Sequence, residues 1–94
     1  MSQKVVRLPL TPEGLRDIKE NWDLTNDEMA RLLGTTSRTI GRYLSGDVEI
    51  PQPTQMLLLL AEAIPQVAIN LAALSQGKPV DVQGYTPIKK LIVA

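Results

Sequence analysis

The 94-residue sequence contains neither cysteine nor histidine. Without cysteine, disulfides and thiolate chemistry are excluded, and without histidine the commonest metal ligand and general base are missing. The sequence also has no Gly-rich phosphate loop and no spaced cluster of metal ligands. We therefore expect a protein that is not an enzyme and that holds no metal and no cofactor.

The chain also lacks an excess of charge of either sign. Ten Lys and Arg residues balance ten Asp and Glu residues, so the net charge is zero and any nucleic-acid partner must be attracted by local charge. The N-terminal residues lack the apolar run of a secretory signal. The apolar stretch 56–74 is interrupted by Glu62, Pro65, Gln66 and Asn70, which argues against a membrane-spanning helix. We expect one cytoplasmic domain.

Signals for the start of a helix occur three times in the first half of the chain. Thr11 followed by a proline is typical of an N-cap, and the apolar spacing after it predicts a helix over about 12–21, with Trp22 in the core. Thr25 and the Glu three residues later form a capping-box pattern that starts a second helix, which a glycine at 34 ends. Thr36 can cap a third helix, about 37–45.

Prolines organise the second half of the chain. Two prolines in the segment 47–53 predict a loop. Because proline is tolerated best in a first helical turn, Pro65 divides the following apolar run into helices of about 53–63 and 65–76.

The C-terminal segment has a different pattern. Val80 and Val82 alternate with polar residues, and "IKKLIV" near the end is β-branched and apolar, which predicts one or two short strands. The sequence thus predicts a mainly α fold: an N-terminal arm over 1–10, a five-helix domain over 11–76 and a tail over 77–94 with a short β-strand or hairpin.

The stretch "LLGTTSRTIGRYLSG" over 32–46 has an unusual local composition. It holds two arginines and no acid, and it is rich in threonine and serine. Leu33, Ile40 and Tyr43 recur as if one side of a helix were buried. The stretch therefore predicts a short positive helix on an apolar base.

The arrangement of residues 26–45 resembles the helix-turn-helix of the lambda repressor and Cro (XRE) family. Ala30 occupies the position where the family keeps a small residue, Gly34 lies at the turn, and Ile40 is the apolar anchor of the second helix. The resemblance extends over about 11–64. It implies a lambda repressor-like five-helix fold and a sequence-specific DNA-binding regulator of transcription.

Two sets of polar residues on this motif are candidate DNA contacts. Arg38 and Arg42 lie four residues apart on one helix face, and the planar guanidinium reaches both O6 and N7 of guanine in the major groove. The short polar residues at the helix ends suit phosphate oxygens. The candidate base-reading residues are Thr36, Ser37, Arg38 and Arg42, and the candidate phosphate-binding residues are Asn26, Thr35, Thr39 and Ser45.

The apolar second half predicts a homodimer. One recognition helix reads only a few base pairs, so an inverted-repeat operator requires two helices about one turn of DNA apart, roughly 34 Å. Between Met56 and Leu74 the only ionisable residue is Glu62, so the chain has more apolar surface than a small domain can bury. The candidate interface residues are Val67, Leu71, Leu74, Ile88, Leu91 and Ile92. Alternatively, the tail folds back over these residues within one chain.

Three functions remain open on the sequence alone. The first is a dimeric repressor, or autorepressor, of a phage, plasmid or bacterial operon. The second is the antitoxin of a toxin–antitoxin pair, which would bind both DNA and a toxin protein. The third is a protein-interaction module without DNA binding, because the chain is not basic overall and Asp47 and Glu49 flank the candidate recognition helix.

Overall fold

Each of the first three helices begins at a threonine cap. The computed structural model describes residues 5–81, 84 and 92. The hydroxyl oxygens of Thr11, Thr25 and Thr36 each accept the backbone N–H three residues further on, at 3.0–3.2 Å. Such a cap satisfies one of the backbone donors that a helix start leaves without a partner. The helices that follow these caps are α1 (Pro12–Asn21), α2 (Asn26–Leu33) and α3 (Ser37–Ser45).

Prolines lie in the first turns of the last two helices, which the sequence predicts for Pro65, whereas it predicts a loop over 47–53 whose last two residues belong to the helix. α4 spans Gln52–Ala63 and has a proline in its first turn, and α5 spans Pro65–Ser75. Ile64 between them is extended, with φ −126° and ψ 103°, because the residue before a proline is disfavoured in the α conformation. The predicted division of the apolar run into two helices is therefore confirmed.

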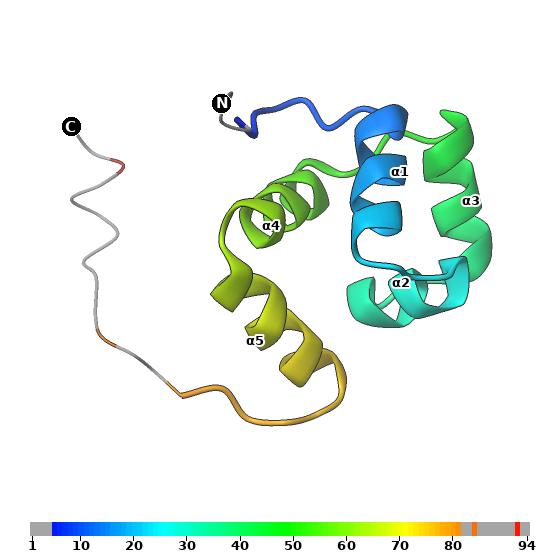
Figure 1. Ribbon diagram of the computed structural model, residues 1–94. Coiled ribbons are helices and arrows are strands. Elements are labelled where there is room, and N and C mark those ends of the chain that lie inside the picture. The colour runs from blue at the N-terminus through cyan, green and yellow to red at the C-terminus, as the bar shows by residue number, and fades with distance from the viewer. Residues whose placement is uncertain (1–4, 82–83, 85–91, 93–94) are drawn as a thin grey trace.

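The helices pack in two groups, which are visible in Figure 1. α3 contacts both α1 and α2, and α4 contacts α5, while α2 also reaches α5. The N-terminal arm (5–11) runs past α4 before it enters α1 (Figure 1). The prediction of a mainly helical fold is confirmed for the residues that the structure describes, in which α1 to α5 are the five predicted helices.

The core is assembled from one large side chain on each of the first four helices. Leu15, Met29, Ile40 and Leu58 are fully buried and come from α1, α2, α3 and α4 in turn. α5 contributes no buried residue. Trp22 is half-buried and packs at the edge of this core, so the prediction of a core tryptophan is correct only in part. The other buried apolar residues are Leu10, Ile18, Ala30, Tyr43, Ile50 and Ala61.

The predicted C-terminal strands are not seen in the part of the chain that the structure describes. Val80 and Asp81, where the first strand is expected, lie in irregular chain after Pro79, and a short strand without a partner is only marginally stable. The remainder of the predicted strands, including most of "IKKLIV", lies outside the described residues. Over 5–81, 84 and 92, no helix has both the length and the apolar character needed to cross a membrane.

Candidate nucleic-acid interface

A tight glycine turn joins α2 to α3. Gly34 adopts the left-handed conformation, with φ 68° and ψ 34°, which costs residues with a Cβ more than it costs glycine. The N–H of Thr35 donates to the carbonyl oxygen of Ala30 at 2.9 Å, so the end of α2 is closed before α3 begins. Ala30 and Ile40 are both buried where the two helices pack. The chain therefore forms two short helices with the connection that the sequence predicts.

The outward face of α3 is basic and open. Arg38 and Arg42 are exposed, whereas Ile40 and Tyr43 are buried on the opposite side of the helix. Gly41 lies between the two arginines, and a Cβ built on it would meet no atom within 4 Å. Among the described residues, no acid forms an ion pair with either guanidinium. Both charges are thus available to an external acceptor.

The hydroxyl groups around this face already make hydrogen bonds within the chain. The Thr36 hydroxyl caps α3 and lies 3.0 Å from the Thr39 hydroxyl. Ser37 donates to a carboxylate oxygen of Asp27. The Ser45 hydroxyl donates to the carbonyl oxygen of Arg42 at 3.1 Å. These four predicted contact residues can still accept hydrogen bonds from DNA, but each hydroxyl proton already has an acceptor within reach inside the chain.

The remaining phosphate candidates lie at the two ends of α2. Asn26 is the first residue of α2 and Thr35 follows its C-terminal glycine, and both are half-buried. The structure places Asn26 close to the start of α3, because its neighbour Asp27 bonds to Ser37. Ser45 is at the far end of α3. These three candidates therefore lie at the ends of α2 and α3.

Asp27 is the residue of this surface that the sequence reasoning missed. It contacts a residue ten positions away, and no periodic or capping pattern signals such a pair. Asp47 and Glu49, beyond the other end of α3, are both exposed. The basic face is consequently bordered by acids at both ends.

One carboxylate near this surface has a shifted pKa. The backbone N–H of Thr25 donates to Glu28 Oε1 at 2.9 Å. This bond, followed by hydrogen bonding with the Thr25 side chain, stabilises the ionised carboxylate and lowers the pKa of Glu28 below its ordinary value of 4.5. The ionised Glu28 thus accepts one of the two hydrogen bonds of the capping box at the first turn of α2. Its role is structural, since its oxygen is committed to the capping box.

The candidate dimer residues are only partly described. On α5, Val67 and Leu71 are half-buried and Leu74 is 59% exposed. Ile92 is also exposed, whereas Ile88 and Leu91 lie outside the described residues. α5 therefore presents apolar side chains to its surroundings.

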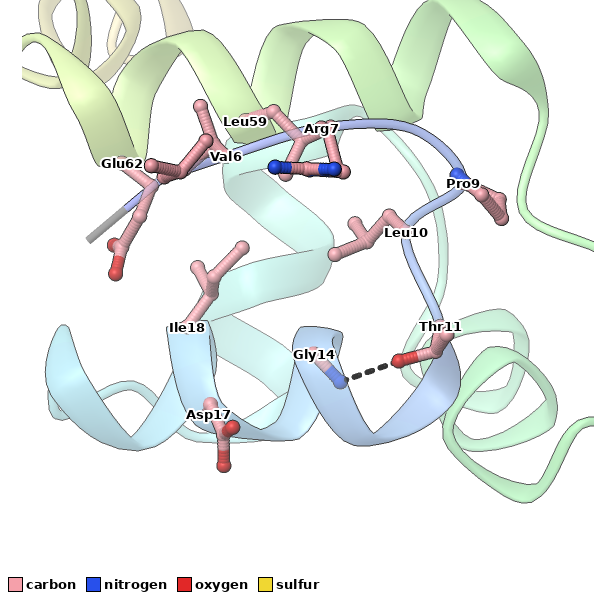
Figure 2. Close-up of a pocket in the computed structure, with 11 residues that line it drawn as sticks. Val6, Arg7, Pro9, Leu10, Thr11, Gly14, Asp17, Ile18, Leu59 and Glu62 are labelled. Atoms are coloured by element: carbon pink, nitrogen blue, oxygen red, sulfur yellow. Dashed lines mark hydrogen bonds between the residues drawn. The ribbon is translucent and has the colours of Figure 1, made fainter.

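A small hollow lies elsewhere, between the N-terminal arm, α1 and α4 (Figure 2). Leu10, Ile18 and Leu59 give it apolar walls, and its volume of about 190 Å³ is below the range usual for ligand pockets. None of its lining residues comes from α2 or α3. Within the described ranges, no three His, Cys, Asp or Glu side chains are grouped to hold a metal ion.

Comparison of the chain with protein-family models, with curated proteins and with solved structures finds no match.

Proposed function

We propose that this chain is a sequence-specific double-stranded DNA-binding regulator of transcription, acting as a dimeric repressor or autorepressor. In this proposal α2 and α3 are a helix-turn-helix of the lambda repressor type, and α3 is the recognition helix. The observation that supports it most is the exposed pair Arg38 and Arg42 on a short helix whose other face is buried. An α-helix fits the major groove of B-DNA with its exposed side chains against base edges.

The proposed contacts divide into two kinds. The guanidinium groups of Arg38 and Arg42 read guanine through O6 and N7, because their planar forks match these two acceptors. Asn26, at the start of α2, holds a phosphate oxygen and carries no sequence information. Since the chain has no net charge, binding weakens only modestly with salt, in proportion to the few phosphates that each subunit neutralises.

Two copies of the chain complete the proposed regulator. Discrimination within a genome requires more base pairs than one recognition helix covers, so a two-fold pair of α3 helices binds an inverted repeat. The side of α5 that carries Val67, Leu71 and Leu74 is the surface we assign to this pairing, together with the tail. Occupation of a promoter by such a dimer blocks transcription.

Substitution of the arginines tests the proposal. Arg38→Ala and Arg42→Ala should each weaken binding to a selected duplex by about 1–3 kcal/mol, the range for a bidentate base contact. Nonspecific duplex should lose much less affinity. Arg16→Ala removes the same charge from α1 and is the matched control. The proposal fails if both α3 variants bind the selected duplex as tightly as the parent.

A protein-binding function, such as that of an antitoxin, is the second candidate. The exposed apolar side chains of α4 and α5, among them Met56, Leu60 and Leu74, favour it, since apolar side chains left exposed in number are typical of interaction sites. A duplex titration at two salt concentrations separates a DNA-binding protein from a pure protein-interaction module. Co-purification with the product of a neighbouring gene would identify an antitoxin.

A further inference from the structure

A hydroxyl at the first turn of α3 is paired with an acid of α2. Ser37 is the first residue of α3 and Asp27 is the second residue of α2, and the Ser37 hydroxyl donates its proton to Asp27 Oδ1. Asp27 is exposed and Ser37 is half-buried, so the pair lies at the surface beside the basic face of α3. The N-terminal residues of a recognition helix are the ones that meet base edges.

This pairing leaves the side chains of Asp27 and Ser37 with acceptors only. A serine hydroxyl has one proton and two lone pairs, and an ionised carboxylate has no proton to donate. Because the Ser37 hydroxyl already donates its one proton to Asp27 in a hydrogen bond, it can only accept a hydrogen bond from DNA. The second carboxylate oxygen of Asp27 can likewise only accept one. In the major groove, the hydrogen-bond donors are the amino groups at cytosine N4 and adenine N6, whereas guanine and thymine offer O6, N7 and O4 as acceptors.

We infer that Asp27 and Ser37 together read an amino group, cytosine N4 or adenine N6, at the base that faces the start of α3. This inference rests on the proposed function. It assigns Asp27 as a residue that sets specificity, both by its own oxygen and by orienting the Ser37 proton. Guanine and thymine are disfavoured at that base, since their acceptor atoms would face acceptor oxygens without a proton between them.

The same carboxylate also lowers affinity for every duplex. Its negative charge repels phosphates near the start of α3. Two unit charges about 4 Å apart in water repel each other by about 1 kcal/mol, which corresponds to about fivefold in affinity. Asp47, exposed beyond the other end of α3, carries an equal charge and has no bond to Ser37. Removal of either charge therefore raises nonspecific affinity, but only Asp27 affects which base is read.

Selection of bound sequences from random duplex, repeated for a set of variants of the full chain, tests the inference. Ser37→Ala identifies the base pair concerned, as the position whose preference changes. At that position the parent should select cytosine or adenine. Asp27→Asn should reduce this preference about two- to tenfold, the range for one hydrogen bond, because the amide can donate and the serine proton is released. Ser37→Thr, which keeps the hydroxyl, should retain the preference.

Asp47→Asn is the matched control. It should raise affinity for random duplex about as much as Asp27→Asn does and leave every base preference unchanged. Circular dichroism verifies that each variant is folded. A parent that selects guanine or thymine at this position, or an Asp27→Asn profile identical to the parent's, overturns the inference while the proposed function stands. A parent that enriches no sequence overturns both.

Discussion

The side-chain oxygen of Gln55 accepts a hydrogen bond from the backbone N–H of Leu10 at 2.9 Å, across 45 residues of sequence. The amide nitrogen of Gln55 donates to the carbonyl oxygen of Ile50 at 2.7 Å. One side chain of α4 therefore joins the N-terminal arm to the loop that follows α3. Both backbone groups belong to buried apolar residues, so this bridge positions the end of the arm and the exit from the candidate recognition helix.

Gln55→Ala should lower the free energy of unfolding by about 1–3 kcal/mol, because it leaves a part-buried N–H and a part-buried carbonyl without their partner. Urea denaturation measures the change. Gln66→Ala is the control, since among the described residues the Gln66 side chain bonds to the nearby Asn70 alone, on the surface of α5, and it should change stability by no more than about 0.5 kcal/mol. Equal effects of the two substitutions would contradict the structural role of the bridge.

The capping box of α2 predicts a pH dependence of stability. The folded chain lowers the pKa of Glu28 below 4.5, chiefly through the Thr25 N–H, so folding favours the ionised carboxylate. The contribution is fully present above the unfolded pKa and is lost as the pH falls through the lower, folded value. Urea denaturation between pH 7 and pH 3 should show this loss. Glu28→Gln, which keeps an acceptor oxygen but cannot ionise, should show a shallower decline, and an identical decline would rule the effect out.

The boundaries of the helices could be predicted because their signals are local. The threonine caps, the glycine at 34 and Pro65 each act within one turn, and the predicted ranges 12–21 and 37–45 coincide with α1 and α3. The predicted fourth and fifth helices, 53–63 and 65–76, differ from the structure by one residue at one end. Helix ends fray, so a difference of one residue at a helix end has no structural significance.

The contacts between segments could not be predicted in this way. The bond from Gln55 to Leu10 and the bond from Ser37 to Asp27 depend on how helices are placed in space, which no spacing in the sequence specifies. Helical periodicity determines which face of α3 Arg38 lies on, so its exposure is predicted correctly. Periodicity does not determine how α2 and α3 are placed, so the contact between Asp27 and Ser37 is missed.

Gly41→Ala should separate stability from DNA binding. A glycine inside a helix costs about 0.5–1 kcal/mol relative to alanine, and the added Cβ meets no atom of the protein within 4 Å, so the variant should be more stable by about that amount. Thermal unfolding measures the gain. Under the proposed function the new methyl group stands between the two arginines on the face toward the groove, and binding to the selected duplex should weaken.

Gly46→Ala provides the contrast for this prediction. Gly46 ends α3 with a φ of 83°, where an alanine is strained, so this substitution should destabilise the chain. If Gly41→Ala is stabilising and leaves binding to the selected duplex unchanged, the outer face of α3 does not approach DNA closely.

Leu74→Lys should dissociate the proposed homodimer. Leu74 is 59% exposed on α5, on the same side of the helix as the half-buried Val67 and Leu71, because the three are spaced four and three residues apart. Between 51 and 77 the only ionisable residue is Glu62, so a lysine at position 74 would place an unpaired charge in an apolar interface. Sedimentation equilibrium at micromolar concentration should show a dimer for the parent and a monomer for the variant.

Ile69→Lys is the matched control for this experiment. Ile69 is 60% exposed on the same helix, but its five-residue separation from Leu74 places it about 140° further around the axis. Both substitutions remove an exposed apolar side chain, so each should change the free energy of unfolding of one subunit by no more than about 0.5 kcal/mol. The control should remain dimeric and bind an inverted repeat as the parent does. A monomeric parent, or a dimer that Ile69→Lys dissociates and Leu74→Lys does not, would show that this side of α5 is not the interface.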